Sequence, residues 1–393
     1  MNIPFFRPNI DAAEIDSVVR CLKTGWVTTG PLTKQFERDF AVYVGSPYAV
    51  AVNSATAALH IALEAVGLKR GEHVLVPTMT FAATAEVVRY FDAVPVLVDC
   101  RESDFNLDVG DALRKVEGLS EAGKSVRAII PVHYGGQVCD MAGVLRLASQ
   151  YGLRVVEDAA HCCPAEYRDG QTSPWKKVGS ESDVACYSFY ANKCITTGEG
   201  GMACTQSAEI ADRMRMMSLH GISRDAWKRF TSDGSWYYEI LAPGFKYNLT
   251  DIASALGVEQ LKRADAFRSA RAQVAEWYAD YLSDVEELGL PSGSPDRLHS
   301  WHLYVVRVLA GRAKASRNLV IEELKRNGIG TSVHWMPLHL HPYYRENFGY
   351  KPEDFPVASR LFPELISLPI YPDLRREQVQ FVCNVLKKAV CDQ

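Results

Sequence analysis

The chain has 393 residues, of which 47% are hydrophobic and 23% charged, and this composition predicts a globular protein of about two domains. Its formal net charge of −4 comes from interspersed residues, so no charged block indicates a nucleic-acid or membrane-surface partner. The sequence lacks both the apolar leader of a secretory signal and a run of roughly 20 apolar residues, so we expect a cytoplasmic protein without membrane insertion.

Short β-rich runs alternate with helical stretches from residue 48 onward. The expected strands span residues 48–52, 74–76, 94–98, 128–132 and 153–156, and helices begin at Thr56 and near Phe81. This alternation predicts a mainly parallel sheet with helices on both faces. Two more strands, at 187–189 and 202–204, are expected on either side of the segment from Lys193 to Gly201.

A charged helix is expected over residues 250–284, because Ile252, Leu256, Val258 and Leu261 recur at helical spacing. We interpret it as a bridge between two domains. Beyond it the sequence predicts a strand at 303–308, a helix at 318–326, a short strand at 332–335 and a final helix at 377–389. The predicted domains are a large α/β domain over residues 1–250 and a unit over 251–393, which holds the bridging helix and a smaller α+β domain.

Ten cysteines are scattered along the chain, and only Cys162 and Cys163 are neighbours in the sequence. This spacing shows neither the paired CxxC motifs of a zinc site nor a disulfide framework. We therefore expect reduced, mostly buried cysteines and no bound metal.

A lysine lies between a strand and a glycine-rich turn, where Lys193 is followed by Gly198, Gly200 and Gly201. A lysine that attacks an aldehyde must be held rigidly and partly desolvated, so that its amine is neutral often enough to react. Most lysines are instead solvated surface groups. The interpretation of Lys193 as a nucleophile therefore depends on its neighbours.

An acidic residue, Asp158, ends the apolar strand that precedes His161. Open α/β sheets bind ligands at the carboxyl ends of their strands. A carboxylate there can keep a pyridine nitrogen protonated, which pyridoxal phosphate (PLP) requires to act as an electron sink. The alternative for Asp158 is a cap on a following helix. His161 could orient Asp158, approach the phenolic oxygen of the cofactor, or be structural.

Two further strand ends carry residues suited to the same cofactor. Ala55 and Thr56 stand where a strand meets a helix, and helix N-termini bind phosphate groups; Ser188 is a second phosphate candidate. Phe81, after the next strand, can stack its ring on a planar pyridine. The alternative for Ala55 and Thr56 is a helix N-terminus that binds no ligand. The alternative for Phe81 is an aromatic side chain of the core.

Taken in order, these elements resemble the DegT/DnrJ/EryC1/StrS family of sugar aminotransferases, a branch of the fold-type I PLP enzymes. The resemblance covers nearly the whole chain. It also rests on the runs at residues 25–31, 131–134, 248–251, 333–335 and 367–369. It implies an α/β fold with a mainly parallel seven-stranded sheet flanked by helices, and a smaller C-terminal α+β domain.

The resemblance also implies roles for the residues named above. Lys193 would bind the cofactor covalently and then move protons at its C4′ carbon. Asp158 would pair with the pyridine nitrogen, Phe81 would stack on the ring, and the start of the helix at Ala55 would hold the phosphate with Ser188. A homodimer with shared active sites is implied as well, because in this family an asparagine at the position of Asn248 reaches the phosphate of the other subunit.

For the substrate, the resemblance points to a nucleotide sugar. Its contacts would come from Trp26, Thr28 and Thr29 in an N-terminal loop, and from His334 and Trp335 in the predicted strand of the small domain. The runs at 53–57, 131–134 and 243–251 look most like the UDP-4-amino-4-deoxy-L-arabinose aminotransferases. Ala55 supports that subgroup, whereas Trp335 and the run 162–164 depart from its pattern.

The expected reaction is transfer of an amino group from an amino acid, L-glutamate, to a keto sugar in two half-reactions, with Lys193 as acid and base. The keto group is expected at C4, and a C3-keto sugar is the alternative. A second alternative is a catalytically silent protein of the same fold that binds a sugar nucleotide. Two other enzyme classes fit less well. The related PLP sugar dehydratases have histidine in place of this lysine, and a nicotinamide enzyme would need a GxGxxG run after the first strand, which the sequence lacks.

Overall fold

The computed structural model describes residues 1–223 and 237–391. Within these ranges, seven strands form a large sheet in the order β1-β9-β8-β5-β4-β2-β3. Of these strands, β9 runs antiparallel to both of its neighbours and the others point the same way. The strands are β1 (Tyr48–Val52), β2 (His73–Pro77), β3 (Val94–Val98), β4 (Val126–Ile129), β5 (Arg154–Asp158), β8 (Val184–Ser188) and β9 (Gly201–Thr205). The mainly parallel seven-stranded sheet predicted from the sequence is confirmed.

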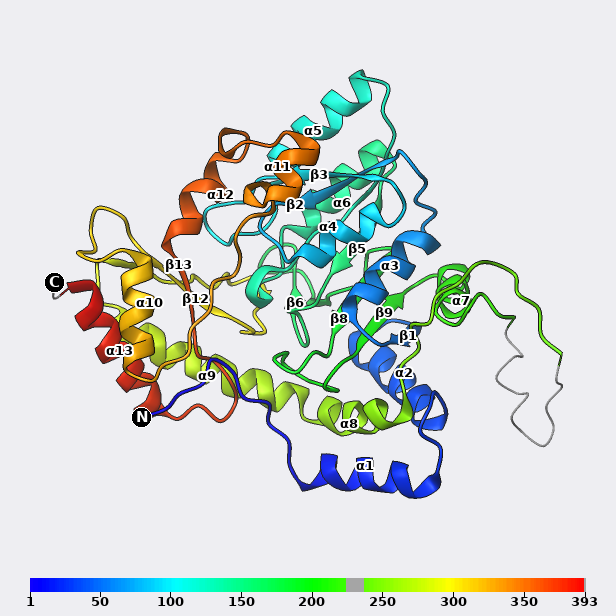
Figure 1. Cartoon of the computed structure of the whole chain (residues 1–393), viewed down its shortest axis with the longest axis horizontal. Helices are drawn as coiled ribbons and strands as arrows, with labels where there is room; N and C mark the ends of the chain where they lie inside the picture. The colour runs from blue at the N-terminus through cyan, green and yellow to red at the C-terminus, as the bar shows by residue number, and fades with distance from the viewer. Residues whose placement is uncertain (224–236, 392–393) are drawn as a thin grey trace.

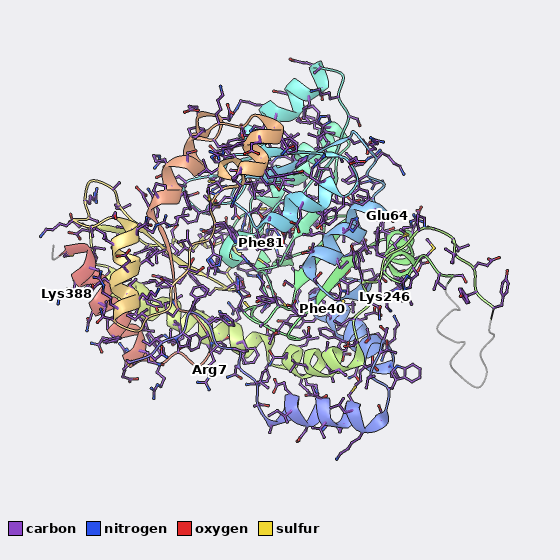
Figure 2. The ribbon with its side chains drawn as sticks, viewed as in Figure 1. Arg7, Phe40, Glu64, Phe81, Lys246 and Lys388 are labelled. Atoms are coloured by element: carbon purple, nitrogen blue, oxygen red, sulfur yellow. The ribbon has the colours of Figure 1, made fainter. Side chains whose placement is uncertain are left out.

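Successive residues of one strand enter two separate cores, one on each face of this sheet. On β2, Leu75 packs with helices α2, α5, α6 and α8, whereas Val74 and Val76 pack with α3, α4 and α7. The sheet is covered on both faces because the strands of a parallel sheet are apolar on both sides (Figure 1). Phe40 of α2, labelled in Figure 2, is fully buried in the first core. The helices are α2 (Pro31–Val44), α3 (Ala55–Ala65), α4 (Ala82–Arg89), α5 (Val109–Glu121), α6 (Met141–Tyr151), α7 (Ala208–Met217) and α8 (Asp251–Lys262).

A third core surrounds a small antiparallel sheet of β10 (Leu288–Gly289), β12 (Tyr304–Val308) and β13 (Leu365–Leu368). Helices α9 (Ala264–Leu282), α10 (Arg317–Arg326) and α13 (Arg376–Cys391) cover it. In contrast, α11 (Pro342–Phe348) and α12 (Pro356–Leu361) pack into the core beside α4. The C-terminal third therefore contributes to the small core and to one core of the large sheet. The remaining short elements are β6 (Glu166–Tyr167), β7 (Lys176–Lys177), β11 (Arg297–Leu298), η1 (Tyr134–Gly136), η3 (Leu338–Leu340), η4 (Pro352–Asp354) and η5 (Phe362–Glu364).

The long helix expected over residues 250–284 is two helices, α8 and α9, which meet at Arg263. The side chain of Arg263 is drawn toward the N-terminal helix α1 (Ala12–Thr24), where it forms ion pairs with Asp11 at 3.0 Å and Glu14 at 2.9 Å. Such a tertiary contact leaves no trace in the periodicity of the sequence. Helix α8 lies in a core of the large sheet and α9 in the small core, and the division at residue 250 stays a prediction.

The short strand predicted at 332–335 is wrong. Ser332 forms only an isolated bridge with Ser367, and the segment then leaves the sheet. Its polar groups pair with side chains instead: the Tyr134 hydroxyl donates to the carbonyl oxygen of His334, and His334 Nδ1 lies 2.7 Å from the Ser367 hydroxyl. The alternation of residue types in this segment resembles that of a strand. Its polar groups nevertheless bond to side chains instead of to the backbone of a neighbouring strand.

Two bulk predictions can be compared with the structure. All ten cysteines carry free thiols, and each is buried except Cys391, which is half-buried. Within residues 1–223 and 237–391, each helix is too short or too polar to cross a lipid bilayer.

Candidate active site

Several residues predicted to hold the cofactor lie at one edge of the large sheet. Strands β1, β2, β5 and β8 run in the same direction, so their carboxyl ends meet at that edge. Asp158 is the last residue of β5 and Ser188 the last of β8, while β1 and β2 lead into the N-termini of α3 and α4. Sheet direction, rather than sequence distance, therefore brings these residues together.

Lys193 lies in a tight turn after β8. Its backbone N–H donates to the carbonyl oxygen of Tyr190 at 2.9 Å, and Thr196 and Thr197 both donate to the carbonyl oxygen of Phe189. Gly198 follows with a positive φ of 80°, which glycine adopts without strain. Burial lowers the pKa of Lys193 to about 8, although the charge of Asp158 acts in the opposite direction. The lysine is thus held in place and is neutral far more often than an exposed one.

Asp158 is 7% exposed, and its carboxylate has two hydrogen-bond donors. The Thr84 hydroxyl donates to Oδ2 at 2.8 Å, and the backbone N–H of Ala160 donates to Oδ1 at 3.1 Å. Burial raises the pKa of Asp158, while these hydrogen bonds and the nearby Lys193 lower it. The chain continues as turns after Asp158, so the alternative of a helix-capping aspartate is wrong.

His161 is enclosed by aromatic rings. It stacks on Trp335 at 5.1 Å between centroids with an interplanar angle of 18°, and the ring of His302 lies 4.2 Å away. Its Nδ1 atom is buried without a hydrogen-bond partner among the described residues. Burial lowers the pKa of His161, and the charge of Lys193 adds to that effect, so the ring is neutral. Within the described chain, the side chain that donates to Asp158 is Thr84 and not His161.

The start of α3 has the features of an anion site. Ser54 caps the helix, with its hydroxyl accepting from the backbone N–H of Ala57 at 3.0 Å, which places Ala55 and Thr56 in the first turn. Backbone N–H groups in a first turn have no partner within the helix. Gly201 of β9 runs so close that an added Cβ would lie 2.4 Å from the Ser54 carbonyl oxygen.

Phe81 directly precedes α4 and is 61% exposed, so the alternative of a core aromatic is wrong. Figure 2 labels this ring near the middle of the molecule. Large apolar side chains are costly to leave in water. The ring therefore offers an uncovered flat surface at the N-terminus of the helix that contains Thr84.

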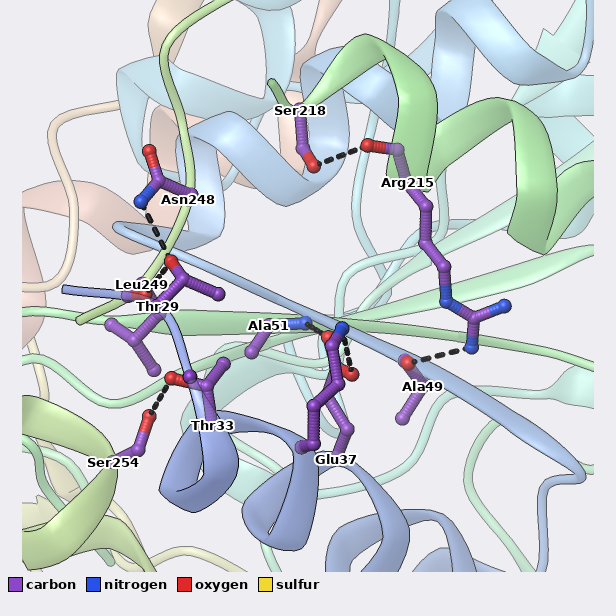
Figure 3. Close-up of polar contacts among 12 residues, drawn as sticks. Thr29, Thr33, Glu37, Ala49, Ala51, Arg215, Ser218, Asn248, Leu249 and Ser254 are labelled. Atoms are coloured by element: carbon purple, nitrogen blue, oxygen red, sulfur yellow. Dashed lines mark hydrogen bonds and ion pairs between the residues drawn. The ribbon is translucent and has the colours of Figure 1, made fainter. Parts of the chain in front are cut away.

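The N-terminal loop that contains Trp26, Thr28 and Thr29 is joined to Asn248. The Asn248 side-chain amide donates to the Thr29 hydroxyl at 2.7 Å (Figure 3), and the Trp26 indole N–H donates to the carbonyl oxygen of Thr29 at 3.1 Å. Lys246 Nζ donates to the Asn248 side-chain oxygen at 2.6 Å. In the described residues, no hydrogen bond or ring contact links this loop to Lys193. The loop forms a second group of predicted site residues, which is tied to the segment before α3 because the N–H of Asn53 donates to the carbonyl oxygen of Tyr247.

His334 and Trp335 belong to the group around Lys193. Trp335 packs edge-on against Tyr134 at 5.4 Å in addition to its stacking on His161, and His334 stacks on Phe5 at 5.6 Å. Burial lowers the pKa of His334 to about 4, with the charge of Lys193 contributing. Both histidines beside the lysine are therefore neutral near pH 7.

Thr84 and His302 were not predicted from the sequence. Thr84 lies in the first turn of α4, and its hydroxyl is 2.7 Å from that of Thr80, which precedes the helix. The threonines on either side of Phe81 are a signal that could have found it. His302 is 4% exposed with both ring nitrogens unpartnered among the described residues. It lies far from the other site residues in the sequence, and no local pattern marks it.

Comparisons with known proteins agree with this geometry. The sequence profile of the DegT/DnrJ/EryC1/StrS aminotransferase family matches residues 8–387. The chain is 45% identical over 390 residues to the uncharacterized protein MJ1066 of Methanocaldococcus jannaschii, covering 99% of this chain and 98% of that protein. It is 41% identical over 389 residues to the spore coat polysaccharide biosynthesis protein SpsC of Bacillus subtilis, with 99% and 97% covered.

The fold also matches a solved structure, Spr1654 of Streptococcus pneumoniae, which is assigned as a sugar aminotransferase. The TM-score is 0.88 at 31% identity, and the match covers 99% of each chain. That protein has been solved in a PLP form and a PMP form, so PLP is the cofactor expected at this sheet edge. With a family match over nearly its whole length, the chain belongs to the DegT/DnrJ/EryC1/StrS family of PLP-dependent sugar aminotransferases.

Proposed function

We propose that the protein transfers the amino group of L-glutamate to the C4 keto group of a nucleotide-linked sugar. The observation that carries the proposal is the partly buried Lys193. Its pKa is lowered to about 8, and its amine lies within electrostatic reach of the Asp158 carboxylate. A lysine neutral at moderate pH can act as a nucleophile and afterwards as an acid and base.

The chemistry of the residues present fits PLP. Lys193 supplies an amine for its aldehyde, Asp158 a buried carboxylate for its pyridine nitrogen, and Phe81 an exposed ring for its flat face. The first turn of α3 with Ala55 and Thr56 supplies N–H groups for its phosphate. We assign Ser188, at the end of β8, to the same phosphate. When bound, PLP supplies an electron sink for the bonds at the carbon that carries the amino group.

The protein's own residues control the protons. The Lys193 amine would hold or give up the proton at the reacting carbon in both half-reactions. Asp158 keeps the pyridine nitrogen charged, and its hydrogen bond from Thr84 favours the ionised carboxylate that this role needs. We assign His161, neutral and stacked under Trp335, to the phenolic oxygen of the cofactor.

A nucleotide sugar is the substrate that the surrounding groups support best. The neutral His334 lies within electrostatic reach of Lys193, and Trp335 stacks on His161, so the two supply hydrogen-bonding and flat surfaces of the kind that sugars bind. Trp26, Thr28 and Thr29 form the second group, which we assign to the nucleotide part. The 41% identity to SpsC, named for spore coat polysaccharide biosynthesis, supports a sugar used in a cell-surface polysaccharide such as an O-antigen or lipopolysaccharide.

We further propose that the enzyme is a homodimer whose active sites are shared. The loop at Trp26 and the side chain of Asn248 are bonded to each other, while no hydrogen bond or ring contact joins them to Lys193 within the described residues. A second copy of the chain that presents this group to its partner's phosphate would complete each site. A cytoplasmic location stays a prediction.

The test of the proposed function is amino transfer measured as 2-oxoglutarate release. Purified enzyme with PLP and L-glutamate receives 4-keto and 3-keto sugars that carry the same nucleotide, with UDP, dTDP and GDP in turn. The proposal expects turnover with a 4-keto sugar and an amino group at C4 of the product by NMR. Turnover restricted to 3-keto sugars would reassign the position, and tight binding without turnover would indicate a catalytically silent protein.

A further inference from the structure

Asp251 is a buried carboxylate outside the residues assigned above, and it accepts hydrogen bonds from one short stretch of chain. It is 2% exposed, and its Oδ1 accepts from the backbone N–H groups of Gly30 at 2.8 Å and Thr33 at 2.9 Å. Oδ1 also accepts from the Thr33 hydroxyl at 2.7 Å, and Oδ2 accepts from the N–H of Leu32 at 3.1 Å. A single side chain therefore takes the place of a cap for the N-terminus of α2.

The remote cap is needed because α2 has no cap of its own. Gly30 stands at the N-cap position without a side chain, and an added Cβ would lie 1.9 Å from the Trp26 indole nitrogen and 2.8 Å from Asp251 Oδ2. The Trp26 ring and the Asp251 carboxylate thus fill the space in which a capping side chain would stand. The side chains of Trp26 and Asp251 therefore both pack against the backbone of Gly30.

The backbone around Asp251 binds the same loop. Its N–H donates to the carbonyl oxygen of Thr28 at 3.1 Å, and the Thr29 hydroxyl donates to the carbonyl oxygen of Leu249 at 2.5 Å. Asn248 donates to that hydroxyl (Figure 3), and Tyr247 accepts from the N–H of Asn53 at 2.7 Å, directly before the cap of α3. The segment 247–251 therefore contacts both the predicted nucleotide loop and the residue directly before the cap of α3.

We propose that Asp251 is a positioning residue for the sugar nucleotide: its carboxylate holds residues 26–30 in the shape that binds the nucleotide. The proposal rests on the proposed function, which assigns that loop to the nucleotide. A charged acceptor with several N–H donors fixes a loop more firmly than single neutral bonds. A loop released from these bonds must be ordered again when the nucleotide binds, and that cost lowers the affinity for the substrate.

The experiment compares Asp251→Ala with Thr250→Ala. Thr250 is the matched control because its hydroxyl caps α8 through the N–H of Ala253 at 3.3 Å and leaves the bonds of Asp251 intact. For Asp251→Ala we expect the KM for the sugar nucleotide to rise by at least about tenfold, because binding must then order the loop. The rate with L-glutamate in the first half-reaction should stay that of the wild type. Thr250→Ala is expected to change neither.

A milder variant and a second readout keep the test decisive. Thr33→Val removes one donor to Asp251 and should raise the same KM by a smaller factor if Asp251→Ala does not fold. Amide hydrogen exchange at Gly30, Leu32 and Thr33 should speed up in Asp251→Ala and not in Thr250→Ala, whatever sugar the enzyme uses. Unchanged exchange, equal changes in both variants, or equal losses in both half-reactions would overturn the proposal. A wild type that reacts with glutamate and with no keto sugar would count against the proposed function instead.

Discussion

Lys193 and Asp158 set the charge at the centre of the site. Burial lowers the pKa of Lys193 to about 8 and raises the pKa of Asp158, and the attraction between the two charges opposes both shifts. Because each group stabilises the charged form of the other, a change at one is felt at the other. Predictions at this scale therefore concern the pair.

Replacing Lys193 by alanine removes the only group assigned to covalent attachment of the cofactor. Lys193→Ala should lose the visible absorbance of the covalently bound cofactor and reduce amino transfer by at least about 1000-fold, as expected when a nucleophile and general base are removed together. Circular dichroism should show an unchanged fold. Lys387→Ala, which alters a half-buried lysine of α13 paired with Asp284, is the control and should keep both properties.

The attachment of PLP to the apoprotein should depend on pH through Lys193. The ammonium form cannot attack an aldehyde, so the rate should rise as pH increases through about 8, the lowered pKa, instead of through the ordinary value near 10.5. Asp158 stabilises the ammonium, so Asp158→Asn should move this midpoint to lower pH. Stopped-flow absorbance across pH 6 to about 10 measures both. A midpoint that moves upward in the variant would contradict the assigned pairing.

At the residue scale, sequence reasoning found what lies at strand ends. Lys193, Asp158 and Phe81 each follow a recognisable apolar run, and the ends of parallel strands must meet. Thr84 and His302 reach the same place through packing. A local sequence pattern does not show that a side chain from a distant element will pack beside Asp158 or His161.

Among the elements, the N-terminus of α3 carries a prediction of its own. Ser54→Ala removes the cap of α3 and should cost about 1 kcal/mol of stability. Because the same turn is assigned to the cofactor phosphate, the affinity for PLP should fall as well. Ser207→Ala is matched, since Ser207 caps α7 through the N–H of Ile210 at 3.3 Å, away from the site. Ser207→Ala should lower the melting temperature by a similar amount and leave the affinity for PLP unchanged. If the two variants bind PLP equally well, the assignment of the α3 N-terminus to the phosphate is wrong.

The elements that were predicted well are those with a strong local signal. Each of the seven large-sheet strands overlaps a predicted one, although β4 and β8 begin two or three residues before the predicted bounds. The strands β2, β3 and β5 carry valine-rich apolar runs, which are typical of buried parallel strands. The break at Arg263 and the loss of the strand at 332–335 both result from long-range partners, Glu14 and Tyr134. The periodicity of a sequence indicates which secondary structure a segment prefers locally. In these two segments, tertiary contacts determine the structure instead.

At the scale of the whole molecule, Asn248 tests the shared active site. Asn248→Ala should weaken PLP retention by about 1 to 3 kcal/mol, the scale for losing a hydrogen bond to a charged group. Equilibrium dialysis against PLP measures the change, and unchanged affinity would remove the assignment.

Mixed dimers then separate contact within one chain from contact across the interface. If Asn248 serves the partner, a dimer of Lys193→Ala and Asn248→Ala has one site with both changes and one with neither. Co-expression should then restore activity at a PLP concentration that leaves the Asn248→Ala homodimer mostly empty. No recovery would place Asn248 in the site of its own chain.

The central claim is that one enzyme completes both half-reactions on a glutamate donor and a keto sugar nucleotide. The most direct measurement is the absorbance spectrum of the PLP-loaded protein, recorded after L-glutamate and again after each keto sugar nucleotide. We predict that glutamate bleaches the visible band and that a UDP-linked 4-keto sugar restores it. A band that glutamate leaves unchanged would contradict the glutamate donor, and a bleached band that no keto sugar nucleotide restores would contradict the proposed acceptor.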